Sequence, residues 1–248
     1  MTTFLGVDVG GTGIKAALVD VDDGSSLSSR RREIATPKPA TPGEVVSVIA
    51  QLVADFDMTN AIGVGFPGVV RGGVVATAPH LDPSWIGMDA PALIARRSGV
   101  GSVTVLNDAD AAGIAEVRFG AGAGLHGVVV MVTLGTGIGT AVFHDGTLIP
   151  NAEYGHLVIG NFEAEHFASG RAMLSEGMSW ATWAQHLDAF LVTVENLIWP
   201  DLFIIGGGIS SEFQRFRGEL GARTPIRAAA LGNDAGIIGA ALAARDAA

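Results

Sequence analysis

Three glycine-rich segments follow apolar stretches of the chain and have the composition of phosphate-binding turns. They are GGTG (10–13), GTGIG (135–139) and GGG (206–208). Backbone N–H groups in such turns can form a concave nest for phosphate oxygens. Thr12 and Thr136 add hydroxyl donors, and Lys15 adds a cation nearby in the sequence. One such turn would more often be a simple hairpin, but three in one chain favour phosphate binding.

Two absent motifs narrow the kind of phosphate site. The sequence has no GxxxxGK[ST] pattern, which excludes a P-loop nucleotide triphosphatase. It also has no GxGxxG that opens a helix, so the dinucleotide-binding fingerprint is missing.

Asp8 stands at the end of the first apolar segment, directly before the first glycine turn. A carboxylate beside a phosphate site repels the ligand unless a cation lies between them. Mg²⁺, held by one or two carboxylates and by water, fits that need. The alternative is an aspartate that only caps its own turn.

Asn107 and Asp108 end the apolar segment SVTVLND (102–108). Polar residues at the carboxyl end of a strand in an open α/β sheet face a ligand crevice. An aspartate there can accept a hydroxyl proton during phosphoryl transfer, and an asparagine can hold a neighbouring hydroxyl. The alternative for Asp108 is to cap a helix that begins near Ala109.

The segment EYGH (153–156) places Glu153 and His156 three residues apart, and Glu165 follows after a short loop. Two carboxylates and an imidazole suit hydrogen bonding to sugar hydroxyls. Metal binding is the rival interpretation, although without HExxH, and with scattered histidines, we expect no structural zinc site. A lone histidine is also often a purely structural residue.

Apolar periodicity predicts the elements that position these residues. Strands are expected at 4–9, 14–21 and 30–36, at 61–68 where the strand ends in a turn, at 102–108, on both sides of the glycine turn within 128–146, and at 201–210 where the strand runs into the triple glycine. Helices are expected at 42–56, 89–97, 111–122, 164–199 and 235–246. Thr41 is the expected N-cap of the first helix, with Pro42 at its first position. A β-rich start followed by alternating helices and strands indicates an α/β fold.

Two strand–turn–strand segments match at an offset of 125 (133 − 8), which places Thr133 on Asp8 and Gly135 on Gly10. One interpretation is two related α/β halves with facing glycine turns. The other is that any hairpin with a glycine turn looks like this.

Composition removes several classes of protein. The 248 residues carry a net charge of −10 and no cysteine, which excludes disulfides and thiolate metal sites and disfavours nucleic-acid binding. No apolar run approaches the roughly 20 residues that cross a bilayer. The N-terminus lacks the features of a signal peptide. We therefore expect a cytoplasmic protein without a membrane partner.

Taken together, the motifs resemble those of the ROK sugar kinases, and among them the bacterial polyphosphate glucokinases. The matching segments cover almost the whole chain in the expected order: DVGGTGIKAALVD (8–20), FPG (66–68), LDPSWIG (81–87), LNDADAAGIAE (106–116), TLGTGIGTAVFHDGTLIPNAEYGHL (133–157), SWATWA (179–184), NLIWPDLFIIGGGIS (196–210) and AGIIGAA (235–241).

The resemblance implies a two-lobed actin-like, hexokinase-like ATPase fold of the ribonuclease H-like type, with a central ligand cleft. The expected small lobe is 1–108 plus 233–248, and the expected large lobe is 109–232. A homodimer is expected by analogy with the family.

The implied activity is a phosphotransferase reaction with an alcohol acceptor: transfer of a phosphoryl group from polyphosphate, ATP or both to the 6-hydroxyl of glucose, with Mg²⁺. Asp108 would be the catalytic base. The implied sugar contacts are Asn107, Asp108, Glu153, His156 and Glu165. The implied donor-binding residues are Asp8 (near Mg²⁺, through water), Gly10, Gly11, Thr12, Gly13, Lys15, Thr133, Gly135, Thr136, Gly137, Gly207 and Gly208.

Two departures from the family pattern leave alternatives open. The segment 158–170 has no cysteine, unlike the zinc loop of many ROK kinases, which agrees with the polyphosphate subgroup. The segment 171–180 has only Arg171 where that subgroup has several basic residues, and His80 replaces its asparagine. The other arginines available for a polyphosphate track are Arg118, Arg215, Arg217 and Arg223.

The alternatives are an ATP-only ROK hexose or N-acyl-aminosugar kinase, and a non-catalytic sugar-sensing ROK protein. The first strand starts at about residue 4, which leaves no room for the DNA-binding helices of ROK repressors. Mannose is a possible second acceptor.

Overall fold

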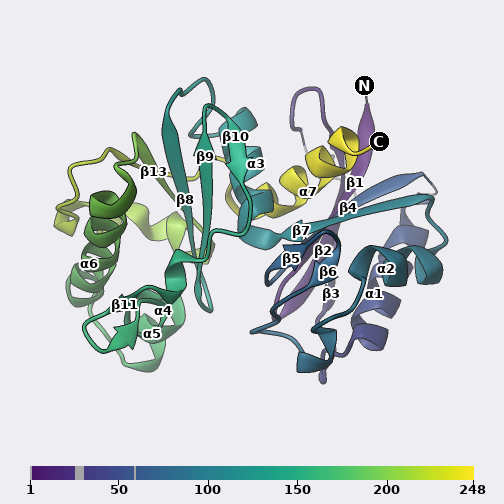
Figure 1. Ribbon diagram of the computed structural model, residues 1–248, viewed down its shortest axis with the longest axis horizontal. Coiled ribbons are helices and arrows are strands. Elements are labelled where there is room, and N and C mark those ends of the chain that lie inside the picture. Colours follow the sequence, from purple (N-terminus) through teal and green to yellow (C-terminus); the bar gives the residue numbers. More distant parts are fainter. Residues whose placement is uncertain (1, 26–30, 59) are drawn as a thin grey trace. The chain divides into compact units, whose positions relative to one another are not determined.

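The secondary structure falls into two five-stranded sheets that share one strand order (Figure 1). This computed structural model describes residues 2–25, 31–58 and 60–248. The chain forms two compact units: unit 1 is Met1–Ala115 with Asp234–Ala248, and unit 2 is Glu116–Asn233. The expected lobes, with boundaries after residues 108 and 232, stay a prediction.

Unit 1 is built on a sheet of order β3-β2-β1-β4-β7. Its strands are β1 (Thr3–Val9), β2 (Gly13–Asp20), β3 (Arg32–Ala35), β4 (Ala61–Phe66) and β7 (Ser102–Asn107). Its helices are α1 (Pro42–Asp55), α2 (Ala90–Ser98), the start of α3 (Asp108–Phe119) and α7 (Ala235–Asp246), with a small hairpin of β5 (Val70–Arg71) and β6 (Val74–Val75) and the turn η2 (Pro83–Trp85).

The strands of unit 1 bury alternate side chains on two faces. Leu5 and Val7 belong to the core cluster that also contains the buried stripe of α1, whose cap is Thr41 as predicted. Helix α7 packs against β1 and β4. It comes so close that a methyl group added at Gly63 would lie 1.7 Å from the carbonyl oxygen of Ala240, so only glycine fits there.

Unit 2 repeats the topology with a sheet of order β10-β9-β8-β13-β14. Its strands are β8 (Val128–Leu134), β9 (Ile138–His144), β10 (Thr147–Ile149), β13 (Leu202–Gly206) and β14 (Ile226–Ala228), with the small pair β11 (Val158–Ile159) and β12 (Phe162–Glu163). Its helices are α4 (Glu165–Ala168), α5 (Gly170–Ser175) and α6 (Trp180–Ile198), and its short 3₁₀ turns are η3 (Tyr154–His156), η4 (Gly208–Arg215), η5 (Arg217–Glu219) and η6 (Gly232–Asp234).

The shared topology includes strand direction as well as order. In both sheets the first strand in this order is antiparallel to the second, and the second is antiparallel to the third. The fourth strand is parallel to the third, and the fifth is parallel to the fourth. Val9 pairs with Ile14 and leaves residues 10–13 in the first turn, whereas Leu134 pairs with Ile138 and leaves residues 135–137 in the second. This repeat confirms the interpretation as two related α/β halves.

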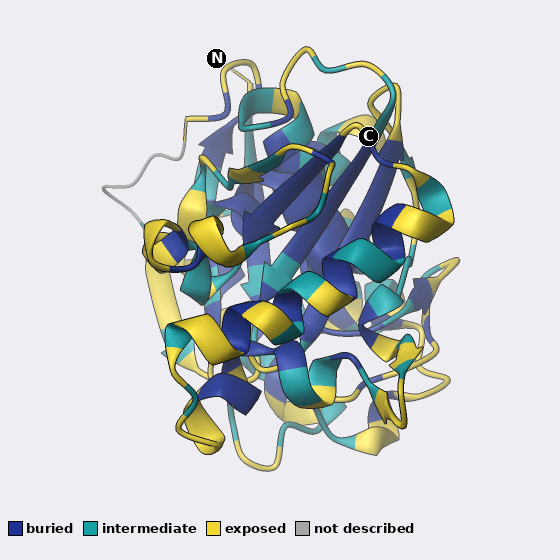
Figure 2. Ribbon diagram, turned by 90° about the vertical axis from the view of Figure 1, so that its left-hand side faces the viewer, coloured by how far each residue is buried: buried dark blue, intermediate teal, exposed yellow. Residues whose placement is uncertain are grey.

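The prediction of one helical segment over 164–199 was wrong. The segment forms three helices, because Ser169 and Ser179 act as N-caps and start new ones: their side chains accept hydrogen bonds from Ala172 N (3.2 Å) and Thr182 N (3.1 Å). Trp183 and Leu187 of α6 are buried in the core as expected, but Leu197 is exposed. Figure 2 shows the strands mostly buried and the helices exposed along one side.

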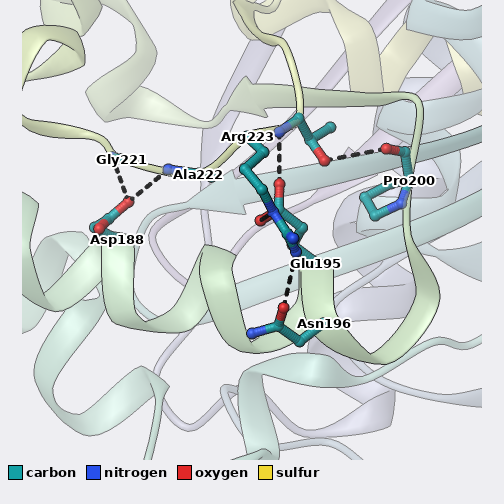
Figure 3. Close-up of polar contacts among 8 residues, drawn as sticks. Asp188, Glu195, Asn196, Pro200, Gly221, Ala222 and Arg223 are labelled. Carbon is teal, nitrogen blue, oxygen red and sulfur yellow. Dashed lines mark hydrogen bonds and ion pairs between the residues drawn. The ribbon is translucent and has the colours of Figure 1, made fainter.

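A buried carboxylate ties α6 to the loop before β14 (Figure 3). Glu195 accepts hydrogen bonds from Arg223 Nε at 3.0 Å and from Thr224 N at 2.5 Å. The Thr224 hydroxyl donates to Pro200 O at 3.1 Å. Two turns earlier on α6, Asp188 accepts from the amides of Gly221 and Ala222.

Among the described residues, none of the helices is both long enough and apolar enough to cross a membrane.

Candidate active site

Hydrogen bonds from Thr36 hold the first glycine turn in shape. Gly10 N donates to Gly13 O at 3.0 Å and closes the turn. The Thr36 hydroxyl donates to Gly10 O at 2.6 Å, and Thr36 N donates to Thr12 O at 3.1 Å. Gly11 and Thr12 themselves are exposed, which suits residues that meet a ligand. Thr36 is the last residue of the strand expected at 30–36, which the structure forms as β3 (Arg32–Ala35), but no motif in the sequence marked its hydroxyl.

Asp8 lies beside this turn, between β4 and the N-terminus of α7. A methyl group added at Gly236 would lie 3.1 Å from Asp8 Cγ, so the carboxylate packs against the first turn of α7. The positive end of that helix favours a negative charge. Burial raises the pKa of Asp8 above its usual value, and the charges of Lys15 and Arg31 oppose this shift. Lys15 is the cross-strand partner of Asp8 in the β1–β2 pair.

Asp108 approaches Asp8 from the end of β7, on the far side of β4. A methyl group at Gly65 would lie 3.6 Å from Asp108 Cα and 3.7 Å from Asp8 Oδ1, so the two aspartates flank Gly65. Strands β1, β4 and β7 run parallel and adjacent, which brings their carboxyl ends to one edge. Unit 1 therefore gathers both aspartates and the first glycine turn, as the sequence pattern indicated.

Asn107 has a structural role that we did not predict. Its Oδ1 accepts hydrogen bonds from Ala109 N (2.8 Å) and Asp110 N (3.0 Å), and its Nδ2 donates to Gly68 O (3.2 Å). Asn107 therefore caps α3, which begins at Asp108 rather than near Ala109 or at 111. Asp108 Oδ1 also accepts from Ala109 N at 2.8 Å. The capping role expected as the alternative for Asp108 is thus filled by Asn107, and the sugar contact of Asn107 stays a prediction.

In unit 2 the second and third glycine segments come together. Gly207 has a φ of 79°, and a methyl group there would lie 2.4 Å from Leu134 O, so the GGG segment passes directly against the end of β8. Thr133 pairs with Gly206 across the β8–β13 register. Gly135 N donates to Gly137 O at 3.1 Å, and Gly135 O accepts from Arg171 N at 2.9 Å.

This last contact places the start of α5 beside the second turn. Gly135 and Thr136 are exposed there, and so is Arg171. Gly208 begins η4 next to the same strand end. An exposed glycine turn with a threonine hydroxyl, next to the first residues of a helix, suits a phosphate chain.

The EYGH segment is anchored to β9 and forms an acidic cluster around one histidine. The Thr140 hydroxyl donates to Ala152 O, and Tyr154 N donates to Thr140 Oγ1 at 2.9 Å. His156 Nδ1 lies 2.9 Å from Glu163 Oε2. Burial raises the pKa of Glu153, the charge of His156 opposes this shift and Glu165 adds to it.

Sequence reasoning placed Glu153, His156 and Glu165 together correctly but missed Glu163. The two-residue strands that carry Glu163 show no periodicity, although its spacing of two from Glu165 was visible. His156, Glu163 and Glu165 offer atoms within 4.8 Å of one another, a spacing also compatible with a cation. Because Nδ1 is already hydrogen-bonded to Glu163, we treat the group as a hydrogen-bonded cluster.

The fold and these strand-end sites define an α/β protein with two related sheets, each carrying glycine turns suited to phosphate. The ROK family profile matches residues 4–176. The chain belongs to the ROK family, and the resemblance seen in the sequence is confirmed.

Known relatives cover almost the whole chain. The chain is 50% identical to a polyphosphate glucokinase of Mycobacterium tuberculosis, over 96% of this chain and 89% of that protein. The structure of an inorganic polyphosphate/ATP-glucomannokinase from Arthrobacter sp. strain KM matches with a TM-score of 0.96 and 44% identity over 100% of both chains. A ROK glucokinase from Streptomyces griseus, solved with glucose and AMPPNP, matches with a TM-score of 0.87 and 29% identity, over 99% of this chain and 100% of that one. The two-domain actin-like sugar-kinase fold expected from the sequence is confirmed.

Proposed function

We propose that the chain is a glucokinase that transfers a phosphoryl group from polyphosphate, ATP or both to the 6-hydroxyl of glucose. The observation that carries this proposal is the pair of aspartates that flank Gly65 beside the first glycine turn. The 50% identity to a polyphosphate glucokinase supports the reaction and the donor.

In the proposed reaction, Asp108 accepts the proton of the glucose 6-hydroxyl while that oxygen forms a bond to the terminal phosphorus. The bond from phosphorus to the donor oxygen breaks, and the shortened donor keeps the electron pair. Amides of residues 10–13 and 135–137 and the Thr136 hydroxyl would stabilise the charge on the phosphoryl oxygens, so catalysis rests on positioning and electrostatics.

Asp8 fits the role of a Mg²⁺ ligand. It offers carboxylate oxygens, which Mg²⁺ prefers, and burial disfavours its charged form unless a cation compensates. When bound, Mg²⁺ would neutralise charge on the donor phosphates. Asp8 would hold it, directly or through water, while Lys15 contributes a second positive charge on the neighbouring strand.

In unit 2, the sugar would be held by Glu153, His156 and Glu165. Carboxylates accept hydrogen bonds from sugar hydroxyls, and the imidazole can donate or accept. The name of the Arthrobacter neighbour, a glucomannokinase, favours mannose as a second acceptor.

The test is formation of glucose 6-phosphate with Mg²⁺ and either long-chain polyphosphate or ATP. We expect Asp108→Asn to bind glucose normally and to lose at least about 10²-fold in kcat, since general-base catalysis contributes 10²–10⁴. The matched control is Asp89→Asn, because Asp89 caps α2 through Ala92 N and asparagine caps equally well. If Asp108→Asn turns over like Asp89→Asn, the assignment of the base is wrong.

The choice of donor is tested at Arg171. We expect Arg171→Gln to reduce polyphosphate turnover more than ATP turnover, because a polymer meets more of the surface around the second turn. The reduction should shrink at high salt. Arg97→Gln, an exposed arginine of α2, is the control. An equal loss with both donors would refute a polymer-specific role.

The homodimer expected from the resemblance is part of this proposal. Light scattering of the purified protein tests it directly.

A further inference from the structure

The loop after the EYGH segment turns back so that Glu163 reaches His156. His156 ends η3, and the β11–β12 hairpin follows at once, with Val158 paired to Glu163. This pairing returns the chain to the histidine within a few residues. The result is the 2.9 Å contact between Glu163 Oε2 and His156 Nδ1.

The contact determines which ring nitrogen carries a proton. The hydrogen bond from His156 holds the pKa of Glu163 below its usual value, so the carboxylate is ionised and can only accept. Nδ1 must therefore be the protonated nitrogen. In the neutral ring, Nε2 is then left with its lone pair; in the charged ring, Nε2 donates.

We propose that Glu163 is a positioning residue for sugar binding, which fixes the ring orientation and the Nδ1 proton of His156 so that Nε2 meets a sugar hydroxyl. This inference rests on the proposed function, which makes His156 a sugar contact. Neither residue is deeply buried: the side chains of His156 and Glu163 are 48% and 39% exposed. An exposed imidazole without a partner rotates freely and adopts either tautomer. Because packing does not hold the His156 ring, the hydrogen bond to Glu163 fixes its orientation and tautomer.

The charges around the ring support the same arrangement. The hydrogen bond to Glu163 raises the pKa of His156 most, partial burial lowers it, and the charges of Glu165, Glu163 and Glu153 raise it further. The charge of His166 in turn lowers the pKa of Glu163. The hydrogen bond to Glu163 is thus the largest influence on the ring, and the charges of Glu153 and Glu165 add to it.

The experiment compares Glu163→Ala, Glu163→Gln and the control Glu219→Ala, an exposed glutamate of η5. Two quantities are measured without any phosphoryl donor. One is the His156 tautomer, from long-range ¹H–¹⁵N spectra assigned with a His156→Asn variant. The other is the Kd for glucose, from calorimetry.

We expect Glu163→Ala to lose the Nδ1–H preference and to bind glucose roughly tenfold more weakly, the effect of losing one hydrogen bond to a charged group. Glu163→Gln should stay within about threefold of the wild type, because its amide oxygen still accepts from Nδ1–H. In turnover assays KM for glucose should rise while kcat changes little, since the lost interaction is made in both ground and transition states.

The proposal is overturned if Glu163→Ala leaves the His156 tautomer and the Kd for glucose unchanged. It is also overturned if Glu163→Gln binds glucose as weakly as Glu163→Ala, because charge would then be the cause. A third contrary result is a double variant Glu163→Ala/His156→Asn in which the two effects on the Kd for glucose are additive. A chelator of transition metals that abolishes glucose binding in excess Mg²⁺ would also overturn it, by assigning Nδ1 to a cation. A wild type that binds glucose but never phosphorylates it would refute the proposed function instead, because the tautomer and Kd do not depend on turnover.

Discussion

The hydroxyl of Thr36 offers a direct test of how far the shape of the first glycine turn controls catalysis. Thr36 is buried, and its hydroxyl donates to Gly10 O at 2.6 Å. Thr36→Val replaces that hydroxyl by a methyl group of similar size, so packing is kept and the hydrogen bond is lost. Its main-chain bond to Thr12 O remains.

A buried acceptor left without its donor costs about 1–3 kcal/mol. If the lost hydrogen bond displaces the turn, the same free energy is lost from the stabilisation of the transition state. In that case kcat/KM for the donor drops roughly 5- to 150-fold. Thr36→Ser keeps the hydroxyl and should remain near the wild type. The assay is glucose phosphorylation at saturating glucose with the donor varied, alongside the thermal midpoint of unfolding.

Thr224→Val is the matched control. Thr224 is also buried, and its hydroxyl also donates to a main-chain oxygen, that of Pro200 at 3.1 Å, but it lies in the α6 network beside Arg223 and not beside the first glycine turn. Both valine variants should lose stability, and only Thr36→Val should lose donor kcat/KM. The reasoning is refuted if Thr36→Val keeps kcat/KM within twofold, or if Thr224→Val loses as much.

Further variants test other parts of the structure. Gly236→Ala places a methyl group 3.1 Å from Asp8 Cγ, so it should displace the carboxylate and raise the Mg²⁺ concentration needed for half-maximal turnover; an unchanged Mg²⁺ titration would contradict the role of Asp8. Glu195→Gln should cost about 1.5–3 kcal/mol of stability at pH 7, the value of hydrogen bonds to a charged group. Burial raises the pKa of Glu195, but its bonds to Thr224 and Arg223 outweigh this and lower it, so the stabilisation is present above the ordinary value of 4.5 and is lost as pH falls through the lowered pKa. Urea unfolding of both proteins should therefore converge at low pH, and a constant gap would show that the charge is not responsible.

The residues that sequence analysis found share one property: local signals mark them. Asp8 and Asp108 end apolar strands, and the glycine turns follow such strands, so periodicity and residue type suffice to locate them. The matching offset between the two halves was likewise visible in the sequence, and strand order then confirmed it.

The residues that it missed depend on contacts between segments. Thr36 lies in a predicted strand, but its role depends on a hydrogen bond to Gly10, which is distant in the sequence. Glu163 reaches His156 only when the β11–β12 hairpin folds back, and these two-residue strands are too short to show a period. Strands β10 and β14 were missed for the same reason. The division of 164–199 was open to prediction, because Ser169 and Ser179 are favoured N-cap types, but the apolar pattern of the long segment outweighed them.

The position of α7 has a consequence for synthesis on the ribosome. Residues 116–233, which form unit 2, leave the exit tunnel as one uninterrupted stretch and can fold on arrival. The strands of unit 1 are made earlier, yet one face of β1 and β4 has no cover until α7 emerges, after unit 2 is complete. We therefore expect the nascent chain to gain protease resistance in residues 116–233 first. Until α7 is made, the apolar face of the earlier half is exposed, and this is the interval in which chaperones have most to bind.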